Sequence, residues 1–290
     1  MKDKRPINES DRILLLEPLF ERVKEEKTDE VLALLKEELD FLVESNASLK
    51  EYVISNANEI NTEYFSYPLL VRKVLDKENL TLVRYQDGEW TCMLKVEPHF
   101  SNKIPKYGIE IDALGDQLLE IIKSKPEYYI STLAGTFYER AAIAWPYLRE
   151  LQNFFVGEVF RRVSVERGLD EFIEALKTRV VIVVGPRWLE PLKDLFDHTH
   201  VLCPYGTLFQ EHEMTSLDER VHAEIKENLD RNPVVLYSCS LPAKVMSHKF
   251  WGLYERKITQ IDMGATWDPY CGKKTRPYHE EVLNRINSTK

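Results

Sequence analysis

Two acidic residues separated by one glycine form the segment best suited to chemistry. Asp87 and Glu89 flank Gly88 directly after residues 80–85, Leu-Thr-Leu-Val-Arg-Tyr. Gly88 has no β-carbon, so a sharp turn there would let a bulky ligand approach. Carboxylate oxygens suit Mg²⁺ or Mn²⁺, and Arg84 offers a guanidinium to phosphate. The spacing predicts a divalent metal held by Asp87 and Glu89 against a diphosphate; the alternative is a solvated Asp-Gly turn.

Two later loops carry features that suit phosphate binding. Gly185 and Arg187 follow an uninterrupted Val/Ile run, so the loop could approach a nucleotide and place the guanidinium on a phosphate. Ser238 and Ser240 follow another apolar run and precede a predicted helix, with Ser240 as its N-cap and Lys244 adding charge. The competing interpretations are an exposed turn and a capped helix that binds no ligand.

A third loop combines acids with aromatic residues. Asp262 ends an apolar run, and Trp267, Asp268 and Tyr270 follow it closely. The aromatic rings could stack on a sugar or base, while either carboxylate bonds hydroxyl groups or acts as a base. The alternative for Asp262 is a buried carboxylate that caps the strand end.

The elements that position these loops alternate between strands and helices. Apolar and β-branched runs predict six strands, at residues 80–85, 127–132, 179–184, 199–203, 233–237 and 258–262. Amphipathic periodicity predicts helices at residues 109–124, 138–162, 188–196, 216–228 and 243–254. This order predicts an α/β fold, Rossmann-like, with a mostly parallel sheet flanked by helices. Ligands gather at the carboxyl ends of such strands, so the loops should converge.

The first part of the chain has a different character. Residues 1–62 are rich in Leu, Glu and Lys, and apolar residues recur there at helical spacing. We expect an N-terminal helical segment over 1–62 and the main domain over 63–290. The helix either packs on that domain or mediates homo-oligomers.

The composition excludes several function classes. The 290 residues carry a net charge of −9, which argues against generalised nucleic-acid binding. No apolar stretch is long enough to span a membrane, and no signal-peptide core follows the basic start. The four cysteines lack zinc-ribbon or disulfide-scaffold spacing. A cytoplasmic protein with reduced thiols is expected.

Residues 83–90, Val-Arg-Tyr-Gln-Asp-Gly-Glu-Trp, resemble the Arg-Tyr/Phe-Gly-Asp-Gly-Glu segment of the GT-D type glycosyltransferases. Residues 180–185 and the Ile-Asp-Met-Gly run at 261–264 are also similar to that family. The resemblance covers residues 65–270 and implies a Rossmann-like sheet with an Asp-x-Glu motif for metal and nucleotide sugar. Gln86 stands where the family has glycine, and residues 265–268 depart from the family's His-rich, acidic ending.

These observations predict a glycosyltransferase that moves a sugar from a nucleotide-diphosphate sugar to a glycan, glycoprotein or other acceptor, assisted by Mn²⁺ or Mg²⁺. The leaving diphosphate would carry the developing charge, so its electrostatic stabilisation would dominate catalysis. Two alternatives stay open at this point. One is another nucleotide-dependent transferase or hydrolase on the same fold, and the other is a non-catalytic α/β scaffold.

Overall fold

The structure is a computed structural model, and it describes most of the chain from Ser66 onward. The described ranges are 66–94, 111–132, 147–148, 151–156, 159–204, 211–254 and 256–288. The predicted N-terminal helical segment, and with it the predicted oligomerisation helix, lies outside these residues.

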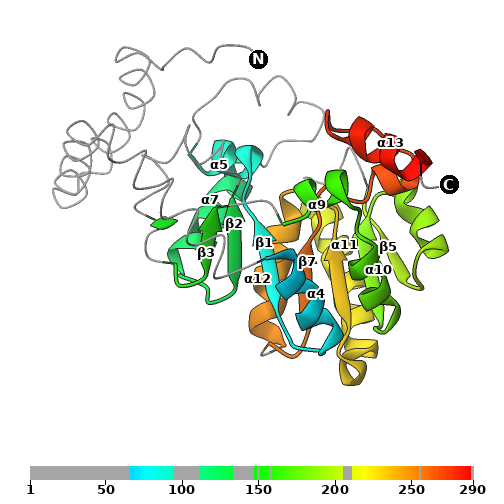
Figure 1. Ribbon diagram of the computed structural model, residues 1–290. Helices are drawn as coiled ribbons and strands as arrows, with labels where there is room; N and C mark the ends of the chain where they lie inside the picture. The colour runs from blue at the N-terminus through cyan, green and yellow to red at the C-terminus, as the bar shows by residue number, and fades with distance from the viewer. Residues whose placement is uncertain are drawn as a thin grey trace, which may run out of the picture.

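The described residues form one sheet of seven parallel strands (Figure 1). The strand order is β3-β2-β1-β7-β6-β4-β5, and every neighbouring pair is parallel. The strands are β1 (Thr81–Arg84), β2 (Tyr129–Thr132), β3 (Phe154–Val156), β4 (Val181–Gly185), β5 (Thr199–Leu202), β6 (Val234–Tyr237) and β7 (Thr259–Asp262). The α/β fold with a parallel sheet predicted from the sequence is therefore confirmed.

Helices cover both faces of the sheet. One face carries α4 (Tyr67–Leu75), α10 (Asp170–Lys177) and the 3-10 helix η2 (Arg187–Asp194). The other face carries α7 (Ile111–Lys123), α11 (Glu211–Glu227) and α12 (Pro242–Leu253), while α5 (Asp87–Leu94) follows β1 at the upper end of the sheet in Figure 1. The remaining elements are α9 (Arg161–Glu166), η3 (Leu229–Arg231), η4 (Pro269–Cys271) and α13 (His279–Ser288). None of the helices in these ranges combines the length and apolar character needed to cross a membrane.

Successive side chains of the central strands pack into two separate hydrophobic cores, one on each face of the sheet. In β1, Leu82 packs with α4 and α10, whereas Val83 packs with α5 and α7. All five residues of β4 are buried, as are all four of β1, β6 and β7. Burial on both faces explains why β4 and β6 are continuous apolar runs in the sequence. It also holds the strand ends, where the candidate site lies, in fixed positions.

The structure contains α4, α5 and α10 in segments for which no helix was predicted, and it differs from the predicted elements at three further places. Strand β3 lies inside the helix predicted over residues 138–162, because three residues are too few to show a strand period. The segment predicted as an α-helix over 188–196 is the 3-10 helix η2, which contains Pro191. Proline lacks the N–H that an α-helix needs, so the tighter helix forms. Helix α13 lies near the end of the chain, beyond the last predicted strand.

Candidate functional site

The loops after four neighbouring strands begin side by side at the carboxyl edge of the sheet. The Tyr85 N–H donates to the Ser131 carbonyl at 2.8 Å, which joins the ends of β1 and β2. The Ser238 N–H donates to Val184 at 2.7 Å, so the ends of β6 and β4 are joined as well. Register also pairs Tyr237 with Asp262 at the ends of β6 and β7. The predicted convergence of these loops is therefore observed.

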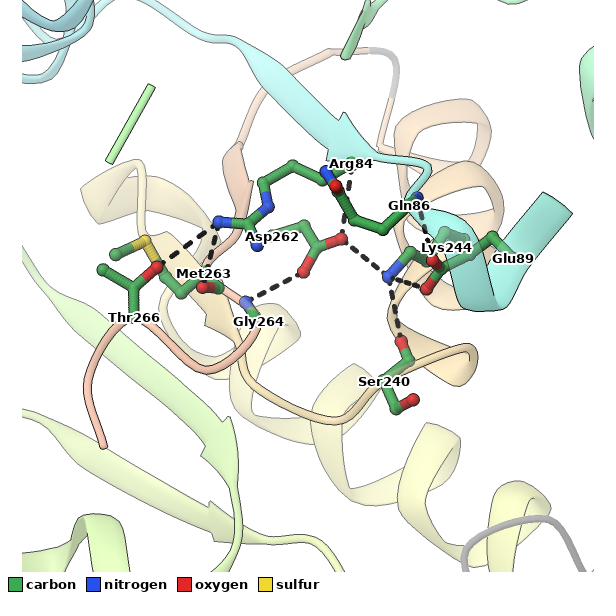
Figure 2. Close-up of polar contacts among 9 residues, drawn as sticks. All are labelled: Arg84, Gln86, Glu89, Ser240, Lys244, Asp262, Met263, Gly264 and Thr266. Carbon is green, nitrogen blue, oxygen red and sulfur yellow. Dashed lines mark hydrogen bonds and ion pairs between the residues drawn. The ribbon is translucent and has the colours of Figure 1, made fainter. Parts of the chain in front are cut away.

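A buried lysine lies at the centre of this edge (Figure 2). The Lys244 ammonium is 2.7 Å from Glu89 Oε1 and 2.9 Å from Asp262 Oδ2, and it donates to the Ser240 carbonyl at 3.3 Å. Exposure is only 3% for Lys244, 6% for Glu89 and 1% for Asp262. Three segments far apart in the sequence are thus joined by one cation, which we call the Lys244 cluster (Glu89, Lys244 and Asp262).

Glu89 reaches the cluster from the first turn of a helix. Asp87 begins α5, so Asp87, Gly88 and Glu89 form a helical turn and not the sharp turn predicted from the sequence. The Gln86 N–H donates to Glu89 Oε2 at 2.9 Å, which satisfies a backbone donor at the start of the helix. The side chain of Asp87 lies outside the described part of the structure.

Asp262 holds two backbone segments together. Its Oδ2 accepts from the Arg84 N–H at 3.2 Å, and its Oδ1 accepts from the Gly264 N–H at 3.1 Å. The carboxylate therefore bridges the end of β1 and the loop after β7. This agrees with the alternative that Asp262 is a buried carboxylate at the strand end.

The Arg84 side chain contacts the loop after β7. Its Nη1 donates to the Met263 carbonyl and to Thr266 Oγ1, both at 3.3 Å, and the residue is buried. In Figure 2 the guanidinium lies over the loop after β7. The sequence predicted a phosphate partner at Arg84, whereas these contacts show a side chain that anchors this loop.

The charge of Lys244 is maintained by its neighbours. Burial by itself would lower the pKa of Lys244, but the Asp262 and Glu89 carboxylates outweigh burial and hold that pKa above its usual value. Lys244 therefore remains an ammonium ion at neutral pH. It was predicted to add charge at an anion-binding helix start, but in the structure its charge is directed at the two acids.

Glu89, the predicted metal ligand whose side chain the structure describes, already faces a cation. Both oxygens of Glu89 and both oxygens of Asp262 accept from a nitrogen of this chain. A divalent ion on Glu89 Oε1 would lie beside the Lys244 ammonium and be repelled by it. No group of three His, Cys, Asp or Glu side chains within the described ranges could hold a metal ion. Any contribution from Asp87 lies outside those ranges.

The other predicted residues divide between the carboxyl edge and the core. Gly185 ends β4, and a β-carbon there would lie 3.3 Å from Ser238 Cβ, so these two residues are neighbours. Arg187 follows with an exposed side chain. Ser240 is exposed, with a left-handed φ of 59°. It is not the N-cap of α12 as predicted, because the helix begins at Pro242 and no side chain caps it.

Asp268 and Trp267 have structural roles that differ from their predicted ones. Asp268 Oδ1 accepts from Trp188 Nε1 at 2.9 Å, and Oδ2 accepts from the Thr275 hydroxyl. Trp267 is fully buried and stacks on Phe172 in the core, so its ring is not available to a sugar. These residues fix the loop after β7.

Sequence reasoning missed several polar groups at the same edge. The hydroxyls of Tyr85, Ser131 and Ser238, and both amide atoms of Gln86, are buried and have no hydrogen-bond partner among the described residues. Buried polar atoms are usually paired, so unpaired ones beside a cluster of charges suit contacts to a ligand. Their position at strand ends was the one available signal.

No protein-family model matches this sequence, and no curated protein sequence matches it. One solved structure, described as "The highly conserved domain of unknown function 1792 has a distinct glycosyltransferase fold", is similar to this chain. The likeness has a TM-score of 0.50 and 16% identity, and it covers 74% of this chain and 82% of the other. The chain therefore has an α/β fold like that of a glycosyltransferase.

Proposed function

We propose that this protein is a glycosyltransferase that takes its sugar from a nucleotide-diphosphate donor. The observation that carries the proposal is the Lys244 cluster, which sits at the carboxyl edge of a parallel sheet in a glycosyltransferase-like fold. Nucleotides bind at this edge in doubly wound folds. Buried charges are costly to assemble, and their concentration here supports a functional edge.

The donor would lie across the loops after β1, β4 and β6. Gly88 lies half-exposed in the first turn of α5, where it leaves the backbone open to the ligand, whereas the space beside Gly185 is filled by Leu189. Among the residues that the structure describes at this edge, Arg187 is an exposed cation that suits the diphosphate. Ser238 and Ser240 supply hydroxyls for the nucleotide or sugar, and Ser238 is supported by its unpartnered oxygen.

Asp87 is the carboxylate that we assign to the donor sugar or to proton transfer. It begins α5 next to Glu89, whose own oxygens are engaged by Lys244 and Gln86. The oxygens of Asp262 accept from the Arg84 and Gly264 N–H groups, so its role is to hold the end of β1 and the loop after β7 together. The metal predicted at Asp87 and Glu89 forms no part of this proposal, because the Lys244 ammonium already lies against Glu89.

We place the reaction in the cytoplasm. No disulfide joins Cys92, Cys203, Cys239 or Cys271, and the first three are buried. Reduced cysteines are typical of proteins in reducing compartments. The acceptor would be a glycan, a glycoprotein or another hydroxyl-bearing molecule that reaches the same edge.

Thermal unfolding with a panel of UDP-, GDP- and CDP-sugars, and with ATP as the comparison, tests the proposal. A nucleotide sugar that binds the folded state raises the unfolding temperature. Mass spectrometry of the products then separates transfer or hydrolysis of the sugar from phosphoryl chemistry on ATP. Stabilisation and turnover by ATP alone would refute the proposal in favour of another nucleotide-dependent enzyme.

A further inference from the structure

The Lys244 ammonium makes three contacts that match its three N–H bonds. Its acceptors are Glu89 Oε1, Asp262 Oδ2 and the Ser240 carbonyl oxygen. An ammonium group has three donors and no acceptor, so this one is fully engaged. Figure 2 shows the nitrogen between the two carboxylates.

The remaining carboxylate oxygens are also engaged. Glu89 Oε2 accepts from the Gln86 N–H, and Asp262 Oδ1 accepts from the Gly264 N–H. A hard divalent ion needs about six oxygen ligands at short distances. To bind here it would have to remove a buried lysine from two acids and break contacts to the backbone.

We propose that Lys244 is the resident cation of this site, and that the donor binds without a divalent ion between Glu89 and Asp262. The inference rests on the proposed function and concerns the same edge of the sheet. Lys244 thereby acts as a positioning residue: it holds α5, α12 and the loop after β7 in one arrangement through the charge that a metal would otherwise supply.

Binding of Mn²⁺ alone to the full chain tests this inference without any nucleotide. We expect Mn²⁺ to affect the unfolding temperature of the wild type and of Glu89→Gln equally, because Glu89 is not a ligand. Lys244→Met removes the ammonium and leaves two carboxylates facing one position, so it should gain a Mn²⁺-dependent rise in unfolding temperature. A Mn²⁺ response in the wild type that is lost in Glu89→Gln would overturn the inference.

Lys249→Met is the matched control. Lys249 lies on the same helix and pairs with Asp218 at the surface, so its removal also deletes one ammonium from an ion pair. It should gain no Mn²⁺ response. An equal gain in both variants would count against a special role for Lys244. If Lys244→Met does not fold, the comparison of the wild type with Glu89→Gln still decides the question.

Nucleotide-sugar binding in the presence of EDTA separates this inference from the proposed function. Stabilisation by a nucleotide sugar that persists in EDTA supports both. Stabilisation that needs Mn²⁺ and Glu89 supports the glycosyltransferase and overturns the role of Lys244. If no nucleotide sugar binds under any condition, the proposed function fails, while the measurement with Mn²⁺ alone still reports on Lys244.

Discussion

Gly264 lies directly against Arg84, so closely that a β-carbon on Gly264 would be 2.7 Å from Arg84 Nη2. The glycine has a φ of +54°, a conformation that residues with a side chain rarely adopt. It directly follows Met263, whose carbonyl accepts from the Arg84 guanidinium. The backbone at position 264 can therefore approach the Arg84 guanidinium only because the residue is glycine. This contact fixes the loop after β7 to the end of β1.

Gly264→Ala should lower the free energy of unfolding by about 2–3 kcal/mol, from left-handed strain together with displacement of the Arg84 guanidinium. Gly272→Ala is the matched control, because Gly272 also has a positive φ of +72° but has open space where its β-carbon would lie. Its loss should be about 1–2 kcal/mol, from strain alone. Urea denaturation measures both, and equal losses would show that contact with Arg84 contributes nothing.

Lys244→Met should destabilise the protein by about 3–5 kcal/mol, because it leaves two buried carboxylates without their cation. Lys249→Met breaks a surface pair on the same helix and should cost at most about 1 kcal/mol. Adding Glu89→Gln to Lys244→Met should recover part of the loss, since one uncompensated charge is removed. Equal free energies of unfolding for the two lysine variants would contradict the arrangement in Figure 2.

Strands β4 and β6 can be predicted from the sequence because burial on both faces leaves a continuous apolar run. Val181–Gly185 is the clearest case, with four β-branched residues before a glycine. Strand β3 was not readable, since Phe154–Val156 has only three residues at the edge of the sheet and lies between helix-like segments. Length does not explain why α13 was not predicted, because this helix has ten residues.

The acids of the site could be identified from the sequence, but their partners could not. Glu89 and Asp262 stand out because they end or follow strands, and the parallel sheet brings those ends together. The direction in which the Lys244 side chain points depends on how α12 is rotated against β1 and β7. The hydrogen bond from the Arg84 N–H to Asp262 joins residues that are 178 positions apart in the sequence. Lysine is rarely buried, so local rules favoured a cation that faces solvent.

Asp268 was a sequence candidate for catalysis, and its contacts predict a structural role instead. Asp268→Asn should lower the free energy of unfolding by about 1–3 kcal/mol, because an amide cannot accept from both Trp188 Nε1 and the Thr275 hydroxyl through two oxygens. Its turnover per folded molecule should remain near that of the wild type. Asp87→Asn should do the reverse, with turnover reduced by about 10²–10³ and stability retained. An equal loss of kcat in both variants, after correction for the folded fraction, would show that Asp268 takes part in the reaction.

His279 is buried at the start of α13, and its Nδ1 accepts from the Thr275 N–H at 3.2 Å. A proton on Nδ1 would place an N–H of the His279 ring against the Thr275 N–H, so the hydrogen bond between them would be lost. Burial lowers the pKa of His279; Asp268 raises it in part, and Arg276 lowers it further. The folded state therefore resists a proton that the unfolded state accepts below its ordinary pKa of about 6.5.

The free energy of unfolding should accordingly fall as the pH is lowered below about 6.5, since the unfolded state then binds more protons than the folded state. His279→Gln keeps a carbonyl oxygen for the Thr275 N–H but does not titrate, so its stability should fall less steeply between pH 7 and pH 5. His198 and His248, whose pKa values burial also lowers, remain in both proteins and cancel in the comparison. Urea denaturation at a series of pH values measures the two slopes. Identical slopes would mean that the His279 ring takes up its proton without disturbing the start of α13, contrary to its contact with Thr275.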